Sequence, residues 1–163
     1  MSNDNLLLDL IGDIEELNSF IGNIDEIKIE FLDNIQIWLF DLISLIENPV
    51  KKYNFDVNLE YTKKIEETIT NMKNKLPKIN NQILPKGTIS IARSICRKVE
   101  RKLIIANKKY SYIDNNCIYF INCISEYLFY LSRYAHYIVN KKDIIYNKSN
   151  ILTLINDFED MKI

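Results

Sequence analysis

The sequence predicts an all-α protein, an antiparallel bundle of five helices, and three observations support this fold class. Three glycines and three prolines among 163 residues leave few turn signals. Apolar residues recur every three or four positions through most of the chain, which is the period of a helix with one buried face. Alternation of apolar and polar residues, which would indicate strands, does not persist beyond a few residues. The length predicts a single domain over residues 1–163, with its core at about 4–140 and a weaker extension at 141–163.

Three helices are predicted in the N-terminal half. Asp4 or Asn5 can cap the first, the second spans about 25–48, and the third spans about 58–76 because Pro77 ends it. The predicted inward-facing residues of the first two are Leu7, Leu10, Ile14, Leu17, Ile21, Ile27, Phe31, Ile35, Trp38, Leu42 and Leu45. Each set repeats at helical spacing, so each helix presents one apolar face to the core.

Two longer helices follow a linker at residues 78–87, which must be ordered by contacts other than its own helix propensity. The fourth helix starts at Thr88 or Ser90, and the fifth spans about 113–140. Their predicted core residues are Ile91, Ile95, Val99, Leu103, Cys117, Phe120, Ile121, Ile124, Leu128, Leu131, Ala135 and Ile138. A short, weaker helix is expected at about 150–161. Side chains on facing helices of such a bundle can build a ligand site.

Composition excludes several classes of protein. The net charge of −1 provides no overall field for nucleic acid or a membrane surface. Three cysteines without a Cys-x-x-Cys motif do not form a disulfide framework, which favours a reducing compartment. The N-terminus shows no secretory signal, and the longest apolar stretch, residues 35–46, is too short to span a bilayer. We therefore expect a cytoplasmic protein with neither nucleic-acid nor membrane partners.

The sequence gives little support for a di-iron site, a glycine-rich phosphate-binding loop or a catalytic cysteine. A di-iron bundle needs Glu-x-x-His on two helices, but the single histidine, His136, has Arg133 three residues before it. We therefore predict no metal site in the protein itself and expect a partly exposed His136. Three glycines cannot supply a phosphate-binding glycine loop. Cys96 has basic neighbours, but it lies on the inward face and is expected to be a buried structural thiol.

Two predicted helices each carry an ordered polar stripe on an otherwise apolar body. Residues three or four apart share a helix face, so the stripes are Arg93, Arg97, Glu100 and Arg101 on the fourth helix and Asn122, Glu126, Phe129 and Arg133 on the fifth. Guanidinium groups suit phosphate, and an aromatic wall suits a flat, partly apolar ligand. Glu126 on a mostly buried helix needs a partner, and Arg97 or Arg101 is expected opposite it. Composition leaves open whether this is a structural ion pair or part of a phosphate site.

Five motifs, in order along the chain, resemble the PduO-type ATP:corrinoid adenosyltransferases. They are GDIEELNSFIG at 12–22, IQIWLFDL at 35–42, ILPKG at 83–87, ARSICRKVER at 92–101 and NCISEYLFYLSR at 122–133. The resemblance spans roughly residues 2–136 and implies a five-helix bundle assembled as a homotrimer. It also implies the reaction: the Co(I) of a reduced corrinoid attacks the 5′ carbon of ATP and expels tripolyphosphate, with Mg²⁺ assisting.

The resemblance also implies roles for individual residues. By motif position, ATP would contact Arg97, Lys98, Glu100, Arg101 and Asn122, and the corrinoid (cobalamin) would contact Glu126 and Phe129. Arg93 would pair with Glu15 of a neighbouring subunit, and Arg97, Arg93 and Glu126 would form the catalytic set.

Some positions depart from the family pattern. The sequence as given begins after the family's N-terminal ATP-binding segment, Gln82 replaces a phenylalanine that faces the corrin, and Lys98 replaces an arginine. The alternative hypotheses are a non-catalytic member that retains corrinoid binding or serves as a helical interaction module, and a bundle whose polar stripes are only internal salt bridges.

Overall fold

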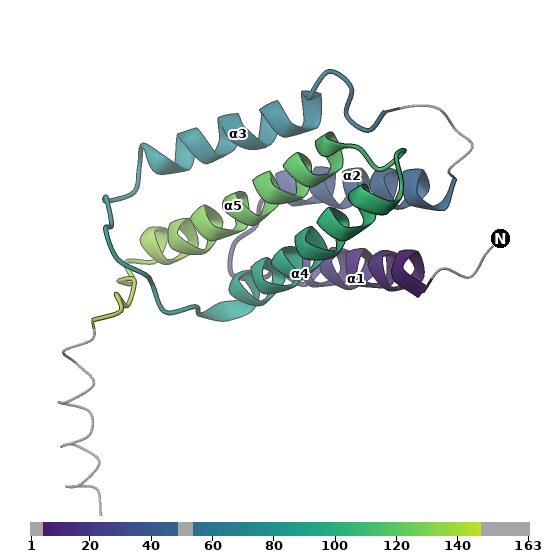
Figure 1. Ribbon diagram of the computed structural model, residues 1–163. Coiled ribbons are helices and arrows are strands. Elements are labelled where there is room, and N and C mark those ends of the chain that lie inside the picture. The colour runs from purple at the N-terminus through teal and green to yellow at the C-terminus, as the bar shows by residue number, and fades with distance from the viewer. Residues whose placement is uncertain (1–4, 49–53, 148–163) are drawn as a thin grey trace, which may run out of the picture.

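The computed structural model describes residues 5–48 and 54–147, and these form five helices. They are α1 (Asn5–Gly22), α2 (Phe31–Glu47), α3 (Glu60–Lys73), α4 (Gly87–Lys109) and α5 (Asn115–Ile138). In Figure 1, α1, α3 and α5 run in one direction along the bundle, and α2 and α4 run in the other. The predicted antiparallel five-helix bundle is confirmed. The helix expected at 150–161 lies outside the described residues.

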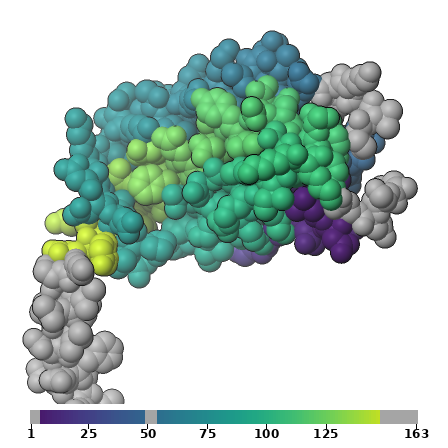
Figure 2. All heavy atoms as spheres, viewed as in Figure 1, coloured from purple at the N-terminus to yellow at the C-terminus, as the bar shows by residue number. Residues whose placement is uncertain are grey.

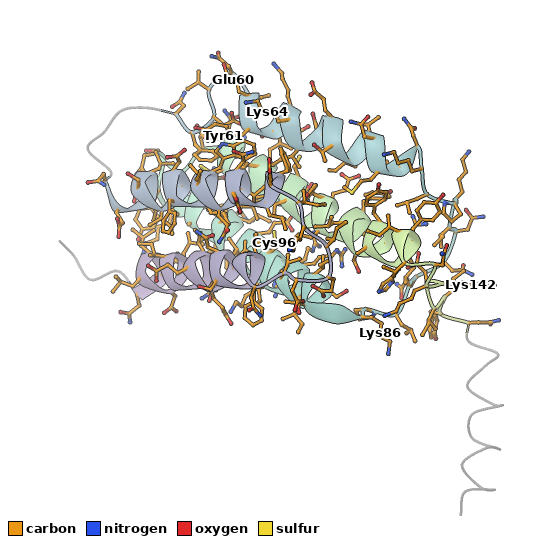
Figure 3. All side chains as sticks on the ribbon, turned by 180° about the vertical axis from the view of Figure 1, so that it is seen from behind. Glu60, Tyr61, Lys64, Lys86, Cys96 and Lys142 are labelled. Atoms are coloured by element: carbon orange, nitrogen blue, oxygen red, sulfur yellow. The ribbon has the colours of Figure 1, made fainter. Side chains whose placement is uncertain are left out.

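α4 occupies the middle of the bundle, where it packs against both α5 and α1. α5 also packs against α3, and α1 packs against α2, so the helices form one continuous core. Figure 3 shows Cys96 of α4 between the helices. None of the helices in the described ranges is both long and apolar enough to cross a bilayer.

The predicted core faces are largely confirmed, with exceptions on both long helices. Ile91 is 50% exposed and Ile138 is 46% exposed, so both predictions are wrong. On α4, Ile89 and Ala92 are buried and Ile91 is not. Ile89 and Ala92 continue the buried face of Cys96, Val99 and Leu103, and α4 packs against α5 and α1. Ile138 is the last residue of α5, three residues after Ala135, the last buried residue of the helix.

α2 begins at Phe31 and not at about Asp25, which corrects the predicted start. The reason is tertiary: the Glu26 carboxylate accepts hydrogen bonds from the backbone amides of Thr88 and Ile89 at the start of α4. A carboxylate is favourable at a helix N-terminus, where amides lack intrahelical partners. Gly87 precedes these amides with φ +76°, and a Cβ there would lie 2.5 Å from Glu26 Oε1. The left-handed backbone favours glycine, and the Glu26 side chain would have to shift to admit a Cβ.

Two aspartates hold the N-terminal ends of α5 and α3. Asp114 caps α5 by accepting from the amides of Asn116 and Cys117 at 3.0 and 3.3 Å. Asp56 accepts from the Tyr61 amide at 3.0 Å and from the Thr62 hydroxyl at 2.7 Å, which holds the loop before α3 against the first turn. Figure 3 labels this end of α3 at Glu60, Tyr61 and Lys64.

Residues 82–84 and 144–146 pair in an antiparallel manner; we call them the clasp. The Leu84 amide donates to the Ile144 carbonyl at 2.8 Å, and the Tyr146 amide donates to the Gln82 carbonyl at 2.7 Å, on either side of an Ile83–Ile145 bridge. In Figure 2 the yellow residues that follow α5 lie against the teal linker at one end of the molecule. The linker is thus ordered by contacts other than helix propensity, as predicted.

Candidate functional site between α4 and α5

The two polar stripes predicted from the sequence meet at Glu100. Its Oε2 lies 2.6 Å from Arg97 Nη1 on the same helix, and its Oε1 accepts a hydrogen bond of 2.9 Å from the Asn122 amide on α5. The Glu100 side chain is only 11% exposed, whereas that of Arg97 is 48% exposed. Glu100 therefore orients a guanidinium whose remaining donors face solvent, which is an arrangement suited to an anionic ligand.

Arg93, one turn before Arg97, lies over an aromatic ring. Its guanidinium carbon is 5.4 Å from the centre of the Phe129 ring, a distance at which cation–π attraction operates. Arg93 Nε is buried and has no hydrogen-bond partner among the described residues. An unpaired buried donor costs free energy, so the described residues leave part of the hydrogen-bonding capacity of Arg93 unsatisfied.

A cavity of about 160 Å³ adjoins Arg93 and Phe129. Leu84 and Pro85 of the linker, Ser90 of α4 and Ser132 of α5 line it, and the Ser90 and Ser132 hydroxyls lie 3.4 Å apart. Arg133, His136 and Asp143 also line it. The cavity combines an apolar wall with a polar rim and adjoins the stripe of arginines on α4.

Glu126 is directed away from the arginines. Its carboxylate lies 2.7 Å from Lys73 Nζ at the end of α3, and this hydrogen bond raises the pKa of Lys73. The pairing expected with Arg97 or Arg101 is therefore wrong, because α3 packs against this side of α5 and brings Lys73 opposite Glu126. Its assignment to the corrinoid remains a prediction, although Glu126 does not line the cavity.

Lys98 belongs to an ion-pair network between α4 and α1. Its Nζ lies 2.5 Å from Glu16 and 3.0 Å from Asp13, and Lys102 lies 2.7 Å from the second oxygen of Asp13. Burial opposes ionisation of Asp13, but hydrogen bonds from Lys102 and Lys98 outweigh it and lower the pKa of Asp13. The hydrogen bond to Glu16 raises the pKa of Lys98. Sequence reasoning missed these acids, although their spacing of three on α1 was a signal.

Three further predicted residues have simple surroundings. Arg101 is exposed one turn beyond Arg97. Glu15 is exposed on α1 and shares a depression of about 420 Å³ with Asn18, Ser19, Gln36 and Phe40. Asn18 Oδ1 is buried there without a partner in the described part of the chain. The roles assigned to Arg101 and Glu15 remain predictions.

The predicted burial of Cys96 and partial exposure of His136 are confirmed. Cys96 is fully buried and its thiol donates to the Ile121 carbonyl at 3.3 Å; burial raises the pKa of the thiol, which opposes thiolate chemistry. His136 is partly exposed, with Nδ1 3.2 Å from Asp143 Oδ1. Within residues 5–48 and 54–147, no three His, Cys, Asp or Glu side chains are grouped so that they could hold a metal ion.

The fold and this site define an all-helical protein that offers oriented guanidinium groups beside an aromatic-walled cavity. The chain belongs to the cobalamin adenosyltransferase family, whose model matches residues 1–135. It is 28% identical over 166 residues to the human corrinoid adenosyltransferase MMAB, covering 90% of this chain and 66% of the relative. It is 27% identical over 164 residues to the corrinoid adenosyltransferase of Bacillus subtilis strain 168, covering 91% of this chain and 84% of that relative.

A solved structure agrees with this assignment. A variant of the PduO-type ATP:corrinoid adenosyltransferase from Lactobacillus reuteri, complexed with cobalamin and ATP, superposes with a TM-score of 0.80. It is 26% identical, and the match covers 91% of this chain and 90% of that chain. The family resemblance stated from the motifs is confirmed. The chain spans about two thirds of the length of the human relative.

Proposed function

We propose that the chain transfers the 5′-deoxyadenosyl group of ATP to the cobalt of a reduced corrinoid and releases tripolyphosphate. Co(I) supplies the electron pair that forms the cobalt–carbon bond, the C5′–O bond breaks, and its electron pair leaves with the tripolyphosphate. The observation that carries the proposal is the Arg97–Glu100–Asn122 network, which joins three residues that the motif resemblance assigns to ATP, in a chain that belongs to the family.

Residues of α4 would bind the nucleotide. Arg97, held by Glu100, and the exposed Arg101 would face the triphosphate and stabilise the charge that develops on the leaving group. Asn122 has one amide hydrogen donated to Glu100 and retains other hydrogen-bonding groups for the nucleotide. The Mg²⁺ that accompanies ATP would neutralise phosphate charge, and the described residues offer phosphate partners more readily than a carboxylate cage for the ion.

The cavity lined by Phe129, Leu84 and Pro85 would bind the corrinoid. Its volume of about 160 Å³ lies below the ~300–1,000 Å³ typical of a pocket that encloses a whole ligand. The cavity would therefore hold one edge of the corrinoid, with the rest extending over the end of the bundle. An apolar wall at this point would keep water from the reacting cobalt.

We propose a homotrimer in which Glu15 of one subunit pairs with Arg93 of the next. Two features support it: Arg93 Nε is buried without a partner in its own described chain, and Glu15 is exposed. Ile37 and Phe40 of α2 are 57% and 61% exposed, which suits contact between subunits. We also propose a cytoplasmic location, which agrees with three free cysteines.

The test is to incubate the protein with ATP and chemically reduced cobalamin and to follow adenosylcobalamin by absorbance and tripolyphosphate by chromatography. We expect both products in equal amounts, and a loss of at least tenfold in kcat/KM for Arg97→Ala. Lys108→Ala, an exposed basic residue near the end of α4, is the matched control and should be unchanged. Cobalamin binding without product would identify a non-catalytic family member. Absence of both product and cobalamin binding would refute the proposal.

A further inference from the structure

Arg133 is a buried guanidinium that the proposed reaction does not use. Its side chain is 7% exposed, its Nη2 donates to the Pro77 carbonyl at 2.6 Å, and its Nε donates to Asp143 at 3.1 Å. One side chain of α5 thus binds both the start of the linker between α3 and α4 and the segment that follows α5. A buried ion pair of this kind persists only when its partners are well placed, so its geometry is tightly defined.

Asp143 uses both carboxylate oxygens in this arrangement. Oδ2 accepts from Arg133, and Oδ1 lies 3.2 Å from His136 Nδ1, one turn further along α5. The Asp143 side chain is 11% exposed. It lies beyond residue 135, where the family match ends, so the contact is contributed by a part of the chain outside that match.

These contacts bear directly on the candidate cavity. Arg133, His136 and Asp143 line it together with Leu84 and Pro85. Asp143 immediately precedes Ile144, whose carbonyl accepts from the Leu84 amide, so anchoring Asp143 also fixes the clasp. Figure 3 shows Lys86 and Lys142, which flank the two halves of the clasp, at the same end of the bundle. The Arg133–Asp143 ion pair therefore attaches the clasp to α5, and two backbone hydrogen bonds join the two halves of the clasp.

We propose that Arg133 and Asp143 are positioning residues that hold the clasp as a wall of the corrinoid site. The proposal rests on the proposed function and deepens it by separating the two substrates. Arg97, Glu100 and Asn122 do not line the cavity, so loss of the clasp should weaken corrinoid binding without weakening ATP binding. Both residues also line the cavity, and the positioning role assigned to them is the placement of Leu84 and Pro85.

The variants to test are Asp143→Asn and Arg133→Gln, singly and together: the first keeps the shape and removes the charge of the pair, and the second removes the guanidinium together with its bond to the Pro77 carbonyl. We expect each single variant to raise the KM for reduced cobalamin roughly tenfold and to leave the KM for ATP within about twofold, since a broken buried pair loosens only its own surroundings. The double variant should lose no more than either single one, because both act on the same wall.

A measurement independent of activity guards against simple misfolding. Hydrogen exchange of the Leu84 and Tyr146 amides, which donate within the clasp, should accelerate in both single variants, while amides in the middle of α5 stay protected. Asp56→Asn is the matched control: it also removes a carboxylate that holds a loop to a helix, but near α3, and should change neither KM nor exchange in the clasp.

The outcomes separate the two proposals. Unchanged hydrogen exchange in the clasp would overturn the positioning role, and so would faster exchange with an unchanged KM for cobalamin. In either case, turnover by the wild-type protein would leave the proposed function standing. A general loss of protection through α5 would also overturn it, since Arg133 would then be a global structural residue. A wild-type protein that neither binds nor adenosylates cobalamin would refute the proposed function itself, whatever the exchange data.

Discussion

Replacing Glu100 by glutamine separates an oriented arginine from a merely basic surface. The carboxylate accepts from Arg97 at 2.6 Å and from Asn122 at 2.9 Å. A glutamine has the same size but only one acceptor oxygen, so its NH₂ group must face one of the two former donors. Hydrogen bonds to a charged group contribute about 1.5–3 kcal/mol each when buried. Because Arg97 is 48% exposed, solvent screens its share, and we expect a loss of about 1–2 kcal/mol in the free energy of unfolding.

The functional consequence should exceed the structural one. Without its anchor, Arg97 samples other rotamers, and the KM for ATP should rise roughly tenfold, equivalent to about 1.4 kcal/mol. Urea denaturation gives the stability change, and adenosylcobalamin formation at varied ATP gives the KM. Glu66→Gln, on α3 and paired with the Tyr119 hydroxyl, is the matched control and should leave the KM unchanged. An unaltered KM for ATP in Glu100→Gln would refute the argument that Glu100 orients Arg97 for the nucleotide.

Three further predictions concern the scaffold. Asp13 has a lowered pKa, so its ion pairs stabilise the fold above 3.8, the ordinary pKa of an aspartate, and this contribution is lost as the pH falls through the folded-state pKa. Urea denaturation from pH 2 to 6 should show a shallower acid loss for Asp13→Asn. Gly87→Ala should destabilise the protein by about 1–3 kcal/mol because of its positive φ and the contact with Glu26, whereas Gly12→Ala, with open space around it, should be neutral or slightly stabilising; thermal denaturation compares them. Cys96 should not react with a thiol reagent at pH 8 until denaturant is added, and rapid labelling of the native protein would contradict its burial.

Local sequence patterns predicted most of the fold, because each helix repeats its apolar face over several turns. α4 begins at Gly87, within three residues of the predicted Thr88 or Ser90, and α5 begins at Asn115, two residues after the predicted start at about 113. The start of α2 was missed because Glu26 interacts with α4, far along the chain, and no local pattern reports that contact. The exposure of Ile91 likewise depends on how α4 is rotated against its neighbours.

The same distinction applies to the site. Arg97, Glu100 and Asn122 could be grouped because helical spacing places each on a stripe and the two helices are adjacent in the bundle. Glu126 was given the wrong partner, since spacing alone does not say which neighbouring helix a stripe will face. Asp143 was not predicted at all, because it lies in a short non-helical segment whose place is set by Arg133.

The clasp has a practical consequence for how the protein is handled. It brings the last described residue, Asn147, to the end of the bundle that carries the cavity, whereas Asn5 begins α1 at the opposite end (Figure 1). An affinity tag, dye or surface tether on the carboxyl-terminal side would therefore leave the described part of the chain at the end that carries the cavity. Attachment ahead of α1 would leave it at the other end of the bundle, so immobilisation for binding measurements should use the amino-terminal side.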